Sequence, residues 1–131
     1  MKLKYEEITF KVIGAAMRVH SKLGSGFQEV VYQRALQSEF KETEIIFERE
    51  FPMAITYNGE QIGERRVDFI IDGKISLEIK AISKLERVHI SQALNYLETY
   101  NLETGLLINF GSESLEYKRL INNKFDAHPT I

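Results

Sequence analysis

Charged residues interrupt a strongly apolar stretch in the middle of the chain. In VDFIIDGKISLEIK, residues 67–80, they include Asp68, Glu78 and Lys80. Two carboxylates and a lysine suit metal-assisted hydrolysis of a phosphodiester, because carboxylates bind Mg²⁺ or Mn²⁺ and the bound metal screens the anionic phosphate. The metal also lowers the pKa of a bound water, which the lysine can orient or help to deprotonate. The same charges also fit the solvent-exposed face of an ordinary sheet.

This chemistry needs both carboxylates on one face of a hairpin, so the register of the hairpin matters. A two-residue loop at Asp72 and Gly73 places Asp68 opposite Leu77 and mixes charged with apolar residues on one face. A loop of residues 71–73 instead keeps the apolar residues together and gathers the charges on the other face. The pairs that this second register predicts are Val67 with Leu77, Phe69 with Ile75 and Asp68 with Ser76.

Two flanking segments can add further polar groups to this face. In HISQALNYLETY, Gln92 and Tyr96 are four residues apart and therefore share one side of a helix. This helix follows the LEIK strand directly, so its start can lie over the carboxyl end of that strand. In GSGFQEVVY, Glu29 can supply a third carboxylate. Each pattern also fits an ordinary amphipathic helix with an exposed polar edge.

The elements that must position these residues begin with two helices. Apolar residues recur at three- and four-residue intervals over residues 6–23, and Gly24 supplies a stop. A second helix is predicted over residues 27–40. Its expected core face is Phe27, Val30, Val31, Ala35 and Leu36, and its expected outer flank is Glu29, Tyr32 and Gln33. A third helix is predicted over residues 85–101, with Val88, Ser91, Leu94 and Leu97 toward the core.

Five strands accompany these helices. Residues 45–80 predict three strands, because β-branched and aromatic residues are separated by Asn58-Gly59 and Asp72-Gly73, which are typical hairpin turns. Pro52 marks the first strand as an edge strand or one with a break. TGLLINF predicts a strand buried on both faces, and SLEYKRLI a last strand. The strand–helix–strand order implies a parallel pair, so the fold class is α/β (α+β) with a mixed sheet of about five strands flanked by helices.

Composition limits the size and setting of this fold. A chain of 131 residues, of which 44% are hydrophobic, has room for one ordinary core. We therefore expect a single domain over 1–131, with residues 124–131 as a frayed tail. The absence of cysteine excludes disulfides and thiolate metal sites and favours a hard cation held by oxygen ligands. Any metal must therefore be held by carboxylates, carbonyls, water or the three histidines.

The location and partners follow from charge and hydropathy. No segment approaches the roughly 18 apolar residues that a membrane span requires, and Glu6 and Glu7 interrupt the place of a signal segment. These observations predict a cytoplasmic protein with no membrane partner. The formal net charge of −2 argues weakly against tight binding of nucleic acid, because such binding depends on neutralising phosphates.

The sequence resembles a known family through these same segments. VHSKLGSGFQEVVYQRAL carries Gly26, Glu29 and Tyr32 in the pattern of the GxxExxY proteins. RVDFIIDGKISLEIKAI, SQALNYL and GLLINFG are similar to the later blocks of that family, and the match runs from about Ile8 to Asn122. That family is grouped with the PD-(D/E)xK nuclease-like superfamily. The resemblance implies a restriction-endonuclease-like core to which the first helix is added.

The resemblance also implies roles for individual residues. It makes Asp68 the aspartate of the second strand, Glu78 and Lys80 the ExK pair, and Glu29 the acidic residue of the preceding helix. Gln92 and Tyr96 are similar to the QxxxY element that orients the catalytic lysine and contacts the strand of nucleic acid. One departure is Phe27, which stands where leucine is usual. It affects no catalytic position.

These observations lead to one principal hypothesis and one alternative. The principal hypothesis is a Mg²⁺- or Mn²⁺-dependent nuclease for DNA or RNA, with Asp68, Glu78, Glu29 and the Ile79 carbonyl as metal ligands. Four basic residues near the ends of elements can position the phosphate backbone or serve solubility: Arg65, Arg66, Lys84 and Arg87. Cutting both strands of a duplex needs two sites, which fits a homodimer. The alternative is a non-catalytic module that binds nucleic acid or a protein with the same fold.

Overall fold

The computed structural model describes residues 5–129 and contains three helices and five strands within that range. The elements, in chain order, are α1 (Glu6–Leu23), α2 (Glu29–Glu42), β1 (Phe47–Tyr57), β2 (Glu60–Ile71), β3 (Ile75–Lys80), α3 (Arg87–Thr99), β4 (Thr104–Asn109) and β5 (Glu116–Ile121). The predicted order of helices and strands is therefore confirmed. The described residues 122–129 contain no helix or strand.

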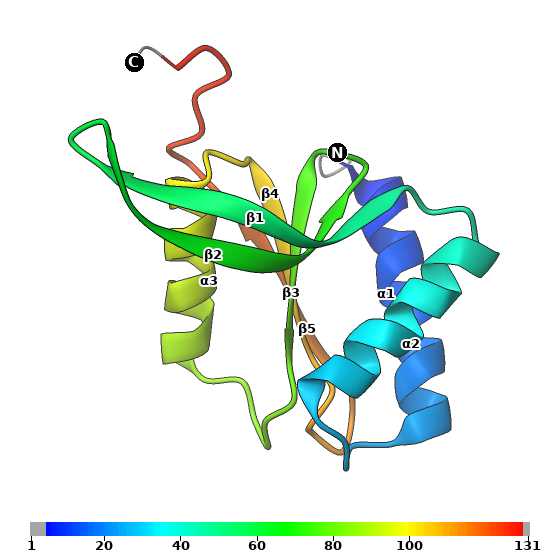
Figure 1. The fold of residues 1–131 in the computed structure, drawn as a ribbon. Helices are drawn as coiled ribbons and strands as arrows, with labels where there is room; N and C mark the ends of the chain where they lie inside the picture. Colours follow the sequence, from blue (N-terminus) through cyan, green and yellow to red (C-terminus); the bar gives the residue numbers. More distant parts are fainter. Residues whose placement is uncertain (1–4, 130–131) are drawn as a thin grey trace.

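The strands form one sheet in the order β1-β2-β3-β4-β5. β3 and β4 are parallel, joined by the α3 crossover, and the other three neighbouring pairs are antiparallel. The mixed five-stranded sheet and its restriction-endonuclease-like class are thus confirmed. β1 is an edge strand, as Pro52 indicated. Figure 1 shows α1 and α2 against one face of the sheet and α3 against the other.

The two faces of the sheet carry separate apolar clusters. The larger cluster joins α1 and α2 to the strands and includes Tyr32, Phe40, Leu77 and Phe110. The smaller one joins α3 to β4 and β5 through Ala93, Leu97, Leu107 and Leu120. β4 supplies residues to both clusters and is buried along its whole length. This confirms that the continuous apolar run of TGLLINF is a central strand.

Both hairpin turns occur where the sequence predicts them. Asn58 and Gly59 have φ values of 52° and 79°, and Asp72 and Gly73 have values of 53° and 67°. Asparagine, aspartate and glycine adopt this left-handed region most readily. Each dipeptide therefore closes its hairpin by local backbone preference.

The predicted register of the second hairpin was wrong by two residues. The loop consists of residues 72–74, and Ile71 pairs with Ile75, Ile70 with Ser76 and Phe69 with Leu77. The reason is burial: Ile71 is fully buried, and the predicted loop would have moved it out of the strand. A shift of two residues leaves every side chain on its expected face. The inference that the apolar and charged residues separate between the faces does not depend on this error.

Two predicted helix faces were also displaced. In α3, Val88 is 65% exposed and Ser91 is exposed, whereas Ala93 and Leu97 are buried. In α2, Tyr32 and Gln33 are buried, although we expected them on the outer flank. Phe27 and Val30, expected in the core, are exposed. Small or polar side chains such as Ala93 and Gln33 therefore occupy interior positions in these helices. Hydrophobicity alone does not predict such positions.

No helix within residues 5–129 is long and apolar enough to span a membrane.

Candidate active site

The candidate site lies where β2 and β3 separate. The two strands pair over three positions, of which the last is Phe69 with Leu77. Two residues after Leu77, the Ile79 N–H donates to the side chain of Asp68, at Oδ2, over 2.8 Å. In β1, opposite this point, Glu50 has a φ of 52°. Arg49 pairs with Phe69 and Phe51 pairs with Val67, so the register between β1 and β2 skips Glu50 and Asp68. We call the opening between β2 and β3 at Asp68 and Glu78 the fork.

Asp68 is held by two donors at the fork. In addition to the Ile79 N–H, Gln33 Nε2 of α2 donates to Asp68 Oδ1 at 2.9 Å. Arg49 Nη1 in turn donates to Gln33 Oε1 at 3.3 Å. A side chain held through both oxygens has a defined orientation, which is what a metal ligand or general base needs.

Glu78 makes a two-point ion pair with Arg65 of β2. Arg65 Nη1 donates to Glu78 Oε1 at 2.6 Å, and Nη2 donates to Oε2 at 3.1 Å. The Arg65 guanidinium also lies 3.8 Å from the centre of the Tyr96 ring and donates to the Tyr100 hydroxyl at 3.3 Å. Tyr96 and Tyr100 stack on each other one helical turn apart. α3 therefore provides an aromatic support for the cation of β2.

A small recess collects the remaining predicted residues. Its lining includes Lys80, Gln92 and Tyr96 together with Arg65 and Glu78. The helix thus brings Gln92 and Tyr96 to the ExK strand, as their four-residue spacing predicted. Within residues 5–129, the structure shows no hydrogen bond between Gln92 and Lys80.

The start of α3 is positioned by a polar clamp on the segment between β3 and α3. Asn109, at the end of β4, accepts from the Ile82 N–H and donates to the Ile82 carbonyl, both at 2.9 Å. A Cβ atom on Gly111 would lie 2.4 Å from the Ile82 backbone, so this close approach requires glycine. Glu86 then begins the helix in a capping box with His89. These contacts fix where the polar face of α3 meets β3.

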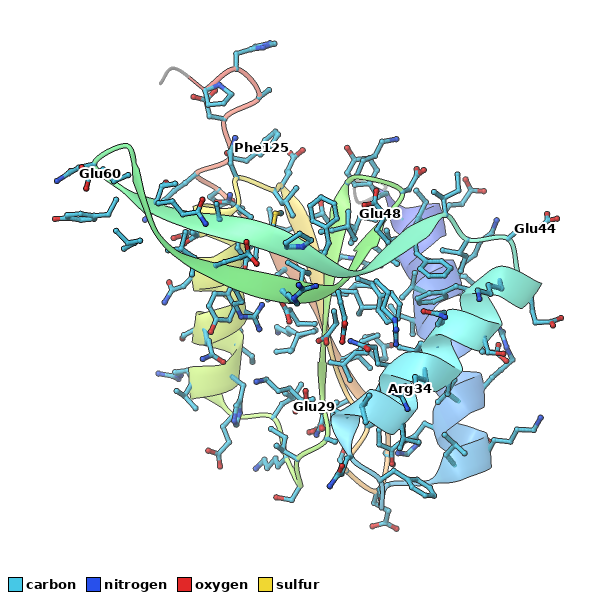
Figure 2. All side chains as sticks on the ribbon, viewed as in Figure 1. Glu29, Arg34, Glu44, Glu48, Glu60 and Phe125 are labelled. Atoms are coloured by element: carbon cyan, nitrogen blue, oxygen red, sulfur yellow. The ribbon has the colours of Figure 1, made fainter. Side chains whose placement is uncertain are left out.

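Glu29 is the first residue of α2, and Figure 2 shows it at the end of that helix beside β3. Tyr32 fixes this end of the helix. Its hydroxyl donates to the Gly24 carbonyl at 2.6 Å and accepts from the Phe27 N–H at 3.1 Å. Its ring stacks on Phe110, with 4.7 Å between the ring centres. Tyr32 therefore holds the loop that places Glu29 near the fork.

The three carboxylates of the candidate site have raised pKa values, although Glu78 is buried, Asp68 is half-buried and Glu29 is exposed. Burial raises the pKa of Glu78 to about 7, although the Arg65 ion pair opposes the change. Burial also raises the pKa of Asp68, against the hydrogen bonds from Ile79 and Gln33. Partial desolvation raises the pKa of Glu29, and the negative charge of Asp68 adds to this effect. Loss of hydration therefore disfavours the charged form of each of these carboxylates.

Comparison with known families identifies the superfamily. Residues 6–120 match the family model of the PD-(D/E)XK nuclease superfamily, which covers the helices, the first four strands and nearly all of the last. The chain belongs to the PD-(D/E)XK nuclease superfamily. Nucleases of this superfamily generally use divalent metals and act on nucleic acid.

Solved structures support the same fold. The structure titled "Crystal structure of SSO0001" matches with a TM-score of 0.55 and 20% sequence identity. The match covers 91% of this chain and 58% of that one, so this chain spans a little over half the length of that protein. No curated protein matches the chain.

The donor chemistry of the fork fits the divalent metal that PD-(D/E)XK nucleases generally use. Asp68 and Glu78 offer hard oxygen ligands of the type that Mg²⁺ and Mn²⁺ prefer, and both have raised pKa values that a cation would reverse. Within residues 5–129, however, no three His, Cys, Asp or Glu side chains are grouped to hold a metal. The expected trio with Glu29 is therefore not assembled as a three-ligand centre. Both oxygens of Glu78 instead bind Arg65.

The four basic residues proposed for the phosphate backbone occupy different places. Arg65 is in the site. Arg66 instead donates to the Glu50 carbonyl at 3.3 Å on the exposed side of the hairpin. Lys84 lies in the segment before α3 and Arg87 is the first residue of that helix, and both are exposed.

Sequence reasoning missed two residues that complete the site. Gln33, which binds Asp68, was predicted on the same flank of its helix as Glu29 but was given no role in the site. Tyr100, which binds Arg65, stands four residues after Tyr96. For Tyr100, the missed signal was the continuation of the helical stripe by one further turn.

Proposed function

We propose that this protein is a metal-dependent nuclease that hydrolyses phosphodiester bonds in DNA or RNA at the fork. The observation that carries the proposal is the meeting of Asp68 and Glu78 beside Lys80 in a chain of the PD-(D/E)XK superfamily. Phosphodiesters resist hydrolysis because their negative charge repels the nucleophile. A cation held by the buried Glu78 and the partly buried Asp68 would address this obstacle directly.

Each residue has a defined task in this proposal. Asp68 and Glu78 would hold Mg²⁺ or Mn²⁺ together with the Ile79 carbonyl, and Glu29, which is not grouped with them as a third ligand, would complete the ligand set through water. The metal supplies charge screening of the phosphate and a more acidic bound water. Lys80 would orient the water that attacks the phosphorus. Gln92 and Tyr96 orient Lys80 and contact the nucleic acid strand.

The finer family assignment is also part of the proposal. We assign the chain to the GxxExxY group because Gly26, Glu29 and Tyr32 match its pattern. The contacts of Tyr32 give this pattern a physical reason: the tyrosine ties down the loop from which the helix bearing Glu29 begins. A homodimer would supply the two sites that cutting a duplex requires.

A second candidate is a binding module on the same fold without catalysis. The observation that favours it is the Arg65–Glu78 ion pair, which occupies both oxygens of a proposed metal ligand. In such a module, Arg65 would take the place of the metal permanently.

A thermal shift experiment distinguishes these two functions. A ligand that binds the native state stabilises it in proportion to the logarithm of its concentration over its Kd. We expect millimolar Mn²⁺ to raise the melting temperature and EDTA to reverse the rise. We also expect cleavage of a labelled oligonucleotide only when the metal is present. An unchanged melting temperature together with an intact oligonucleotide would favour the binding module.

A further inference from the structure

Arg65 is bound to Glu78 in a way that surface ion pairs are not. A second arginine–glutamate pair in the molecule, Arg18–Glu39, has the same shortest distance of 2.6 Å. That pair is largely exposed, at 54% and 30%, whereas the side chains of Arg65 and Glu78 are 26% and 8% exposed. Exposed pairs contribute little to stability, but a shielded two-point pair holds its partners in place.

The Arg65 guanidinium also fills the space beside Glu78. The recess that it lines with Glu78, Lys80 and Tyr96 has a volume of about 10 Å³, which is about the room of one water molecule. Mg²⁺ requires near-octahedral coordination and keeps several waters. A hydrated cation therefore does not fit in this recess, on the Lys80 side of Glu78, while Arg65 remains there.

We propose that Arg65 and a divalent cation compete for the Glu78 carboxylate, and that the displaced Arg65 binds a phosphate oxygen of the nucleic acid. This inference rests on the function proposed above and adds a step to it. Without metal, Arg65 is the counter-cation of the fork. With metal, the same side chain becomes a substrate-binding group.

The surroundings of Arg65 suit this change of partner. The Tyr96 ring and the Tyr100 hydroxyl hold the guanidinium independently of Glu78, so Arg65 stays beside the fork after release. The N–H donors of the guanidinium lie in one plane, and their spacing matches the oxygens of a phosphate as well as those of a carboxylate. Arrival of a divalent cation therefore frees a phosphate-binding group at the place where the phosphate must sit.

The first test measures metal affinity in variants of the two adjacent arginines. Titration calorimetry with Mn²⁺ is performed on the wild type, Arg65→Met and Arg66→Met. If the competent form is about a tenth of the population, removing Arg65 lowers the apparent Kd about 10-fold. Arg66→Met removes the same charge one residue away and is expected to change the Kd less than about twofold by screening. An Arg65→Met Kd equal to or weaker than that of the wild type, or an equal gain in Arg66→Met, would overturn the competition.

A second test follows Arg65 in the unmodified protein, so it does not depend on how a variant folds. The NMR signals of the Arg65 guanidinium are recorded during a titration with diamagnetic Mg²⁺. We expect its N–H protons to exchange faster with water at saturation, because the bonds to Glu78 are lost. Guanidinium signals that stay unchanged at saturation would overturn the displacement of Arg65.

A third test concerns the phosphate. Oligonucleotide affinity is measured against salt concentration with saturating Ca²⁺ in place of the natural metal. Loss of one phosphate contact lowers the slope of log K against log salt by about one unit, so Arg65→Met is expected to have the shallower slope. An unchanged slope would overturn the phosphate role.

These results separate this inference from the proposed function. Tighter Mn²⁺ binding by Arg65→Met without cleavage by the wild type would support competition and contradict the nuclease. Metal-dependent cleavage by the wild type with no gain in Arg65→Met would do the reverse. No Mn²⁺ binding by either protein would overturn both.

Discussion

The two faces of β3 carry different kinds of side chain. Leu77 and Ile79 face α1 and α2 in a sealed apolar cluster. On the opposite side, Glu78 and Lys80 face the recess beneath α3, where the apolar cluster is much smaller. One strand of six residues therefore contributes to the main core and to the candidate site.

This difference indicates that one face of the sheet stabilises the fold, while the other face carries the candidate reactive groups. Burial of apolar side chains stabilises the α1–α2 face, and its packing keeps the strand in place. Burial of Glu78 and Asp68 costs free energy, because neither carboxylate is fully compensated. The sheet can hold carboxylates whose burial is unfavourable on one face, because apolar packing on the other face stabilises the fold without them.

The largest expected effect is on the apolar face. Leu77→Ala removes a fully buried side chain and should destabilise the fold by about 2–5 kcal/mol, since it leaves a cavity. The matched change on the other face, Lys80→Ala, should cost less than about 1 kcal/mol while removing turnover. Urea unfolding with a parallel cleavage assay measures both. Equal losses of stability would contradict the division between the faces.

The next effect is the dependence of stability on pH without metal. Burial raises the pKa of Glu78 from its ordinary 4.5 to about 7, so between these values the folded chain keeps a proton that the unfolded chain has lost. Stability from this group is therefore complete below pH 4.5 and is lost as the pH rises to about 7, by about 1–3 kcal/mol.

Urea unfolding in EDTA across this pH range tests the prediction. Glu78→Gln removes the titrating group, so the stability of the wild type relative to this variant should fall as the pH rises. A constant difference between the two proteins would show that Glu78 titrates normally.

The smallest expected effect concerns α3. Gln92→Ala should lower turnover about 10- to 100-fold, which is typical for residues that orient a catalytic group, and should leave the melting temperature unchanged. Asn95→Ala, at another exposed position of the same helix, should retain full turnover. Steady-state cleavage assays on both variants measure the effect. Wild-type turnover in Gln92→Ala would reduce Gln92 to a surface residue.

The fold was predictable where a short-range preference determined it. Asn58-Gly59 and Asp72-Gly73 close hairpins by their own backbone tendencies, and helix periodicity located all three helices. The exact register at Asp72 was not predictable in this way, because parity permits a shift of two residues. Burial of Ile71 against the helices selected the actual register, and that is a tertiary effect.

The site was predictable in its residues more than in its contacts. The spacing of Gln92 and Tyr96 and the parity of Asp68 and Glu78 brought these residues together correctly. The pairing of Arg65 with Glu78 was not predictable, since it depends on the long hairpin of β1 and β2 (Figure 1) and on the irregular backbone of β1 at Glu50, where φ is 52°. Tyr32 was misjudged because its hydroxyl finds backbone partners inside the protein.

The most direct test of the account is the melting temperature of Asp68→Asn with and without Mn²⁺, measured together with cleavage of a labelled oligonucleotide. An amide is a much poorer ligand than a carboxylate for a hard cation, and it carries no charge to repel Glu78. We therefore expect the variant to keep or slightly raise its stability without metal, and to lose both the Mn²⁺-induced shift and cleavage. An Asp68→Asn protein that responds to Mn²⁺ and cleaves like the wild type would contradict the assignment of the fork as a nuclease centre.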